Sequence, residues 1–497
     1  MPDSTSLDWE LLAPEYILAA WAALVISADI FWGRLSKEQL GWFAALGFVI
    51  AGGVSLIWWD DSRQFGELAD INDYTTIFRV FFCGIGAFAC IISAKYVSER
   101  LLHPGEYYGL ILVAVVGANG MAAAHELLTA YISLELMSFS LYVLTSYAKF
   151  DLRSNEAGLK YMLLGAFSSA IFLYGIGLMY GATGTTQYAG MSEVLSGDIE
   201  DIEWSVYLGL AMMIGGLGFK VAAVPFHMYT PDAYEGAPIP ITALISALSK
   251  AAAMAFFLKL FTQAFIPLID DWRYFIAALA VLTMALGNLV ALQQRNIKRL
   301  FAYSSIGQVG YLLVGIAALS QDSASAIVLH MIGYVVTNLA AFTCIILYYN
   351  WTSKEEIYEY KGLAERAPYL ALCMTIALFS LAGMPLFAGF ATKFVLFQAA
   401  ANEDMLWLAG VASFFSFVSL YYYLVVIREM YLGEPEERTR FRTPVLEYTA
   451  LTVLTAGVFL MGLYPKPVFD IVEDGTESIF AGVEVDGGDG GAVLSEP

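Results

Sequence analysis

Residues 239–262 decide the fold and read IPITALISALSKAAAMAFFLKLFT. About 20 apolar residues in one helix cross the roughly 30 Å hydrocarbon core of a bilayer, and this stretch is long enough to do so. Its apolar residues are continuous, without the alternation of an outer-membrane strand, so a helix is expected. It also contains Lys250 at its centre and Lys259 near its end. The stretch therefore predicts a membrane helix with a lysine at its midpoint.

The rest of the chain has the same apolar character. Hydrophobic residues make up 59% of the 497 residues and charged residues 14%, against roughly 45–50% and about 25% in soluble domains. A soluble core cannot bury that much apolar surface, so the excess must face lipid. We predict an all-α polytopic membrane protein of about fourteen spans, near residues 14–32, 40–59, 77–97, 107–124, 126–147, 156–182, 205–227, 239–262, 272–293, 299–319, 323–349, 369–400, 404–430 and 443–465.

Related positions recur about 170 residues apart, which indicates an internal repeat. His330 falls on Lys160 at this offset, and Gly389-Phe390 echoes Gly218-Phe219. The predicted organisation is spans 1 to 3 in residues 1–106, two related five-helix units in 107–262 and 272–430, a last span in 443–465, and an acidic, flexible tail in 466–497.

Charge sets the expected orientation and excludes several functions. With the loop after the first span in the cytoplasm, cytoplasmic loops hold most of the 25 lysines and arginines, so both termini are expected outside. The acidic N-terminus lacks the basic region of a cleavable signal peptide. No basic surface offsets the net charge of −21, which excludes nucleic-acid binding. Neither a metal site nor any other cofactor is expected, because no CxxC pair occurs among Cys83, Cys90, Cys344 and Cys373.

The lysines inside the predicted spans are the expected functional residues. A lysine at the bilayer centre costs roughly 2.5–3.5 kcal/mol. Lys259 is close enough to its helix end to extend its amine to the interface, and Lys160 is near the start of its helix. Three further lysines lie too far from a helix end to reduce this cost in the same way, and these are Lys220, Lys250 and Lys393.

Proton transfer is one explanation for these lysines. Only Glu135 is an acidic residue in a mid-span position, so carboxylates cannot neutralise all of them. A lysine in water has a pKa of about 10.4, and burial lowers it towards neutrality, where the amine can load and release a proton. The alternative is structural, with one bridge between Glu135 and a lysine and the other lysines neutral.

Two predicted spans contain breaks next to their lysines. Pro225 interrupts the seventh span, and Gly383-Met384-Pro385 interrupts the twelfth ahead of Lys393. Discontinuous helices at mid-membrane depth are tolerated where they line a cavity. His227 lies in the first break and His330 in the eleventh span. For both histidines a proton-relay role and a packing role stay open.

The motifs around these breaks resemble a known family. Residues 220–238, KVAAVPFHMYTPDAYEGAP, followed by SK at 249–250, are similar to the signature of the antiporter-like subunits of respiratory complex I (NADH:quinone oxidoreductase) and of Mrp-type Na⁺/H⁺ antiporters. GFATKF at 389–394 is more specific and resembles the subunit N group of that family. Tyr229 departs from the usual tryptophan and Thr392 from a common glycine, but neither removes a charge.

The resemblance implies a fold, a function and partners. The fold would be fourteen helices with two inverted five-helix repeats and broken helices 7 and 12. The chain would translocate protons in a bacterial inner membrane, beside further antiporter-like and other membrane subunits, and would itself bind no NADH, flavin, iron–sulfur cluster or quinone. The rival is a subunit of a Mrp-type antiporter, whereas buried lysines disfavour a passive cation channel. The implied relay comprises the ion pair of Glu135 and Lys220 with Lys160 close by, Lys250 as central carrier, Lys393 on the exit side, His330, and His227 as a further candidate.

Overall fold

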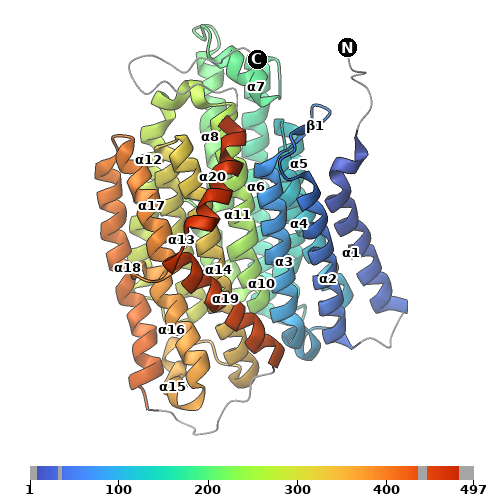
Figure 1. Cartoon of the computed structure of the whole chain (residues 1–497), viewed down its shortest axis with the longest axis vertical. Helices are drawn as coiled ribbons and strands as arrows, with labels where there is room; N and C mark the ends of the chain where they lie inside the picture. Colours follow the sequence, from blue (N-terminus) through green and yellow to red (C-terminus); the bar gives the residue numbers. More distant parts are fainter. Residues whose placement is uncertain (1–7, 32–35, 435–444, 481–497) are drawn as a thin grey trace.

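The computed structural model describes residues 8–31, 36–434 and 445–480. The chain forms one elongated bundle of roughly parallel helices (Figure 1). One end carries a hairpin of strands β1 (Arg63–Phe65) and β2 (Ala69–Ile71) together with helix α7 (Tyr188–Leu195), and the opposite end carries α15 (Leu363–Arg366). We call these the upper and the lower end, as in Figure 1.

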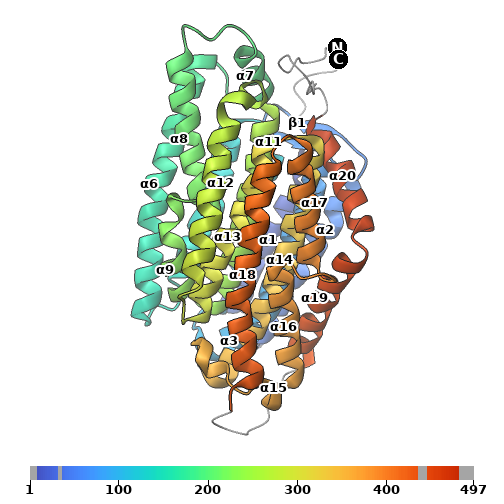
Figure 2. The same ribbon diagram turned by 90° about the vertical axis from the view of Figure 1, so that its left-hand side faces the viewer.

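The remaining helices follow one another up and down the bundle (Figure 2). Their bounds are α1 Ala13–Phe31, α2 Lys37–Ser55, α3 Asp73–Arg100, α4 Pro104–Ala123, α5 Leu127–Thr145, α6 Leu152–Thr183, α8 Glu203–Val221, α9 Tyr229–Gly236, α10 Ile239–Leu244, α11 Lys250–Gln263, α12 Ile269–Ala291, α13 Ile297–Ala317, α14 Gln321–Thr352, α16 Pro368–Ala382, α17 Ala388–Asn402, α18 Leu406–Leu432, α19 Val445–Leu463 and α20 Lys466–Phe480. A π-helical turn over Ile245–Ser249 joins α10 to α11.

The predicted all-α membrane fold is confirmed. Within the described residues, 13 helical stretches are long and apolar enough to cross a membrane. The predicted twelfth span is present as α16 and α17, which have 15 residues each. The break between them begins at Gly383, whose φ of 84° is the left-handed conformation that glycine adopts at low cost. The total of fourteen spans and the inverted repeats stay predictions.

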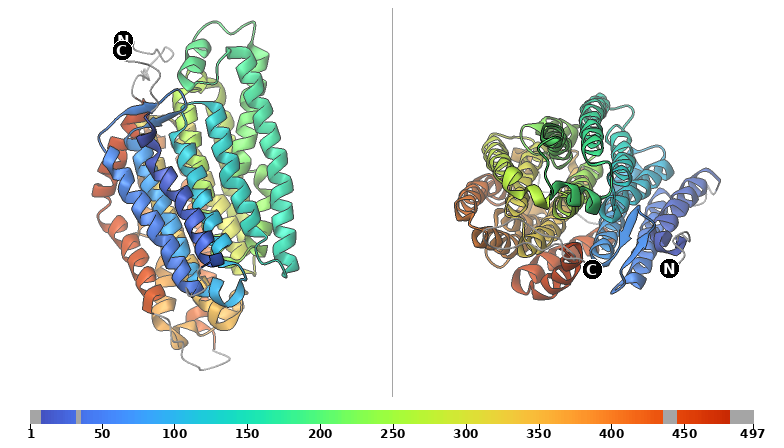
Figure 3. Two further views of the ribbon diagram at one scale, coloured as in Figure 1. Left: turned by 90° about the vertical axis from the view of Figure 1, so that its right-hand side faces the viewer. Right: turned by 90° about the horizontal axis from the view of Figure 1, so that it is seen from above.

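The stretch from Ile239 to Gln263 lies in the middle of the molecule. Its apolar window is completely buried by other helices, unlike that of every other span in the described residues. The view from above shows helices on all sides of this region (Figure 3). Small residues at 251–253 allow neighbouring helices to approach closely. The central lysine of the sequence is therefore enclosed by protein rather than by lipid.

The C-terminal segment corrects one sequence prediction. Residues 466–480 form helix α20 rather than part of a flexible tail, and this helix packs on α3 and α14. Val472 and Ile479 are buried at a spacing of seven residues, which places both on one face. Between them, Thr476 Oγ1 lies 2.6 Å from Ser325 Oγ of α14. The part of the predicted tail at 481–497 lies outside the described residues.

Candidate functional site

Glu135 and Lys220 form a buried ion pair. Lys220 Nζ lies 3.7 Å from Glu135 Oε1, and the two side chains are 4% and 16% exposed. Lys220 Nζ also donates to Ser138 Oγ at 2.8 Å, and Ser169 Oγ donates to Glu135. The pairing of these two residues, which the family resemblance implied, is thus present in the geometry.

The predicted break in the seventh span lies directly after this pair. Helix α8 ends at Val221 because Ala222 adopts a left-handed backbone with φ 66°. Such a conformation in a residue other than glycine costs roughly 1–3 kcal/mol and needs support from its surroundings. Lys220 occupies the last turn of α8, where the free carbonyls and the helix dipole favour a cation. His227 lies in the break, half-buried, and its Nδ1 has no hydrogen-bond partner within the described residues.

Lys250 occupies the centre of the site. It is the first residue of α11 after the π-helical turn, and only 3% of the residue is exposed. Lys250 Nζ donates to Ser305 Oγ at 2.5 Å and lies 5.7 Å from the ring centre of Tyr234. Among the described residues no carboxylate forms an ion pair with it. Its amine therefore faces a hydroxyl and an aromatic ring.

Helix α13 connects Lys250 to Lys393. Gln308, one turn after Ser305 on α13, donates from Nε2 to the Leu381 carbonyl oxygen at 3.1 Å. Lys393 Nζ donates to the same oxygen at 2.8 Å. Leu381 lies in the last turn of α16, so the C-terminal dipole of that helix faces the ammonium and favours its charged form. The lysine that follows the predicted break thus caps the helix that precedes it.

His330 contacts Thr392, the residue that precedes Lys393 in the sequence. His330 Nδ1 lies 2.9 Å from Thr392 Oγ1, and its Nε2 is buried without a partner in the described part of the chain. One turn further along α14, the Tyr334 hydroxyl donates to the Ser246 carbonyl oxygen of the π-helical turn at 3.4 Å. The face of α14 that carries His330 and Tyr334 therefore contacts both α17, which contains Lys393, and the π-helical turn that precedes Lys250.

Lys160 lies in a separate charged cleft at the lower end. Its Nζ is 2.8 Å from both Glu156 and Asp232, and its side chain is 45% exposed. Arg299 joins the same group through Asp232 at 3.1 Å and Glu235 at 2.8 Å. The cleft has a volume of about 240 Å³. The structure places Lys160 with these acids and shows no ion pair between it and Glu135 in the described residues.

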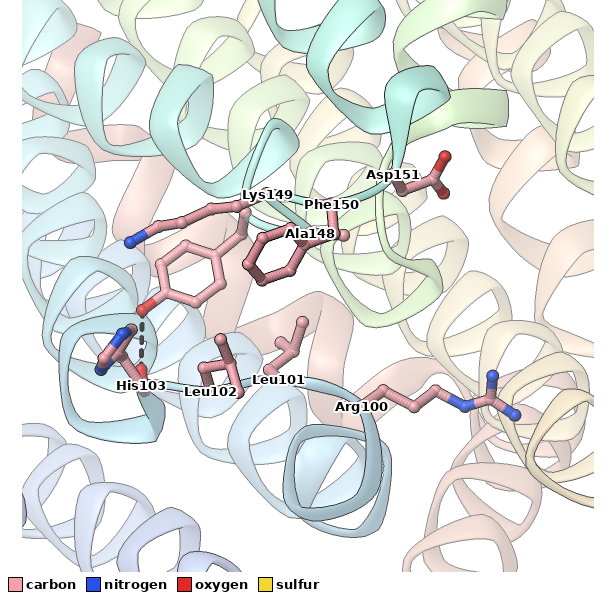
Figure 4. Close-up of a pocket in the computed structure, with 9 residues that line it drawn as sticks. Arg100, Leu101, Leu102, His103, Ala148, Lys149, Phe150 and Asp151 are labelled. Carbon is pink, nitrogen blue, oxygen red and sulfur yellow. Dashed lines mark hydrogen bonds between the residues drawn. The ribbon is translucent and has the colours of Figure 1, made fainter.

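Figure 4 shows a second pocket, which lies at the lower end of the bundle. It measures about 270 Å³ and lies between the loop that joins α3 to α4 and the loop that joins α5 to α6. The Tyr147 hydroxyl donates to the His103 carbonyl oxygen across it at 2.6 Å. None of the predicted relay residues lines this pocket.

The comparisons with known proteins identify the family. A family model described as "NADH:quinone oxidoreductase/Mrp antiporter, TM" matches residues 124–419. The chain belongs to this family. Subunit N of NADH-quinone oxidoreductase from Trichlorobacter lovleyi is 39% identical over 477 residues, which cover 95% of this chain and 98% of that relative. The predicted resemblance to the subunit N group of the family is confirmed.

Solved structures of the family share the fold. A chain of respiratory complex I from Thermus thermophilus is 28% identical, with a TM-score of 0.78 over 93% of this chain and 100% of that one. A chain of the Mrp complex from Dietzia sp. has a TM-score of 0.81 over 94% of this chain and 98% of that one, but is only 19% identical. The second likeness shows the common fold alone.

Two features of this family member were missed from the sequence. The first is a polar stripe on α13, formed at spacings of three residues by Ser305, Gln308 and Tyr311. This spacing could have been recognised in the sequence. Lys393 Nζ lies 4.6 Å from the Tyr311 ring centre. Lys259 was expected to extend towards the interface, and this expectation is wrong. It is buried and lies 3.2 Å from Asp70 Oδ2 of strand β2, because the hairpin brings a carboxylate down to it.

Buried charge is also neutralised elsewhere in the bundle. Arg79 of α3 is fully buried and lies 2.9 Å from Glu15 of α1. Within the described residues no group of three or more histidine, cysteine or acidic side chains is placed to hold a metal ion.

Proposed function

We propose that this chain translocates protons as a membrane subunit of a NADH:quinone oxidoreductase whose redox chemistry is carried out by other subunits. The relative from T. lovleyi carries that enzyme's name, and the T. thermophilus neighbour is a chain of respiratory complex I. The proposed partners are the other membrane subunits of such a complex, further antiporter-like subunits among them. The chain itself would hold no redox cofactor.

The observation that carries this proposal is the environment of Lys250. Burial removes the water that would stabilise a charged amine, and among the described residues no carboxylate pairs with Lys250 to replace it. A small change in nearby charge then decides whether the amine holds a proton. Arginine could not serve in its place, because a guanidinium does not release its proton in proteins.

We propose an order of proton transfer that is consistent with these contacts. The pair of Glu135 and Lys220 supplies the changing charge, since opening or closing a 3.7 Å contact alters the field at neighbouring groups. Lys250 takes up the proton and passes it along the polar face of α13 towards Lys393, which donates to the same Leu381 carbonyl oxygen as Gln308. In this scheme His330 and His227 tune or extend the route.

The charged cleft around Lys160 is the proposed uptake side. Cytoplasmic loops of membrane proteins are enriched in lysine and arginine. We therefore assign the lower end of the bundle, which has the basic loops, to the cytoplasm and both termini to the outside. Lys160 is 45% exposed in this cleft and contacts Glu156 and Asp232, so titratable side chains meet solvent here.

The rival function is a subunit of a Mrp-type antiporter, which shares the fold. Vesicles that contain the intact complex separate the two functions when a pH-sensitive dye reports proton movement. We expect protons to move on addition of NADH and quinone in sodium-free buffer, and Lys250→Ala to reduce that movement. Lys466→Ala is the matched control, because Lys466 is exposed on α20. Proton movement that requires a sodium gradient and ignores NADH would favour the rival.

A further inference from the structure

The short helix α9 has two faces with different surroundings. It packs on both α6 and α13 in the lower half of the bundle (Figure 2). At about 100° per residue, Asp232 and Glu235 share one face, and Tyr234 lies roughly opposite Asp232. The two carboxylates are partly exposed in the charged cleft, whereas Tyr234 is fully buried. Helix α9 therefore lies between the cleft and the interior of the bundle.

The buried face of α9 contacts Lys250. Lys250 Nζ lies 5.7 Å from the ring centre of Tyr234, within the roughly 6 Å range in which an aromatic ring attracts a cation. Ser305 Oγ, which accepts from Lys250, lies 3.5 Å from the Tyr234 hydroxyl. The negative face of the ring stabilises an ammonium but gives no comparable stabilisation to a neutral amine. Tyr234 therefore favours the protonated form of Lys250.

The exposed face of α9 is held by ion pairs to two helices. Asp232 lies 2.8 Å from Lys160 Nζ of α6 and 3.1 Å from Arg299 Nη1 of α13. Arg299 also lies 2.8 Å from Glu235. A single pair at this exposure contributes little, but here one carboxylate links α9 to both of its neighbours. Asp232 is thus placed to fix the position of α9.

Tight packing makes α9 move as a unit. A methyl group at Gly236 would collide with Ala157 of α6, so the two helices are in close contact there. Lys298 Nζ of α13 donates to the Ala237 carbonyl oxygen, directly after the end of α9, at 3.4 Å. A shift of the exposed face of this eight-residue helix therefore also moves the ring of Tyr234 on the buried face.

We propose that Tyr234 sets the proton affinity of Lys250 and that Asp232 is a positioning residue that acts on Lys250 through α9 and Tyr234. This inference rests on the proposed function. While Asp232 is paired, the ring stays beside the amine and favours proton uptake. When the pairs of Asp232 open, the ring moves away and Lys250 releases its proton more readily. Tyr234 acts by electrostatics and exchanges no proton.

The first test is the number of protons moved per electron by the intact complex in vesicles over a series of pH values. At high pH Lys250 stops loading protons, so the ratio falls. Loss of the ring in Tyr234→Leu should weaken proton binding about 2- to 30-fold, so we expect this fall about 0.4–1.5 pH units lower than in the wild type. Tyr234→Phe keeps the ring and should follow the wild type. A tyrosine that only fills space predicts no shift in the leucine variant. Titratable side chains of the neighbouring helices stay in place in each variant, among them Glu135, Lys220, Tyr74 and Tyr334.

The second test asks whether Asp232 acts through Tyr234. Asp232→Asn removes the charge that pairs with Lys160 and Arg299, so we expect a shift in the same direction as in Tyr234→Leu. The double variant should shift no further than Tyr234→Leu alone, because the ring through which Asp232 acts is absent. The matched control is Asp470→Asn, which removes an ion pair with Lys466 on α20 and should follow the wild type. Additive shifts in the double variant would mean that Asp232 acts by its own charge, which would overturn the positioning role.

The outcomes separate this inference from the function on which it rests. A wild-type ratio in Tyr234→Leu at every pH would overturn the role of Tyr234 and leave the proposed function standing, whereas a wild-type ratio in Lys250→Arg would overturn both. Should Tyr234→Leu fail to assemble, Tyr234→Met decides, because methionine fills the space without an aromatic ring. A shift to lower pH in Tyr234→Met supports the inference, and a wild-type profile overturns it. Should Asp232→Asn fail to assemble, Arg299→Gln, which removes the link to α13, takes its place in the double variant.

Discussion

The ion pair between Glu135 and Lys220 should show strong energetic coupling. At 3.7 Å and an effective dielectric constant of about 20, the attraction between two unit charges is about 4.5 kcal/mol. Both side chains are largely buried, so solvent screens this attraction little. Removing one partner strands a buried charge, which typically costs about 3–5 kcal/mol. The other polar contacts of each residue, Ser138 for Lys220 and Ser169 for Glu135, recover part of that cost.

A double-mutant cycle measures this coupling. Glu135→Gln and Lys220→Met are each expected to destabilise the chain, and the double variant by about 2–4 kcal/mol less than the sum of the two. The assay is unfolding of this chain in the purified complex on titration with a denaturing detergent, followed by proteolysis. Glu135→Gln combined with Lys393→Met is the control, because these residues do not contact each other and their effects should add. An additive result for Glu135 and Lys220 would refute the ion pair as an energetic unit.

Other consequences follow from single contacts. Gln308→Leu removes the amide between Ser305 and the carbonyl oxygen that Lys393 caps, so proton translocation in vesicles should slow while the complex still assembles; an unchanged rate would remove Gln308 from the route. Gly389→Ala would place a methyl group against the backbone of α16, so the assembled complex should be lost or strongly reduced in membranes, whereas Gly410→Ala meets open space and should assemble normally.

The sequence was sufficient for features that depend on local composition. Long apolar runs, the breaks at Pro225 and at Gly383, and the depth of Lys250 can all be read from neighbouring residues. The pairing of Glu135 with Lys220 came from the family resemblance, because depth alone left open which lysine Glu135 contacts. The structure contains the long apolar helices, the two helix breaks and the contact between Glu135 and Lys220.

Features that depend on distant contacts could not be predicted. Lys259 is neutralised by Asp70, 189 positions earlier (259 − 70) in a short hairpin that has no hydrophobic signal of its own. Arg79 is likewise paired with Glu15 of another helix, a contact that neighbouring residues in the sequence do not indicate. The polar stripe on α13 was visible as a spacing pattern, but only the fold shows that it lies between two lysines.

The most direct test of the proton relay is the Lys250→Arg variant of the intact complex. Arginine keeps the positive charge but cannot give up its proton at physiological pH. Protons moved per electron in sealed vesicles should therefore fall below the wild-type ratio, and Lys250→Ala should show a similar loss. A wild-type ratio in Lys250→Arg would contradict the relay, since a side chain that never deprotonates cannot carry protons.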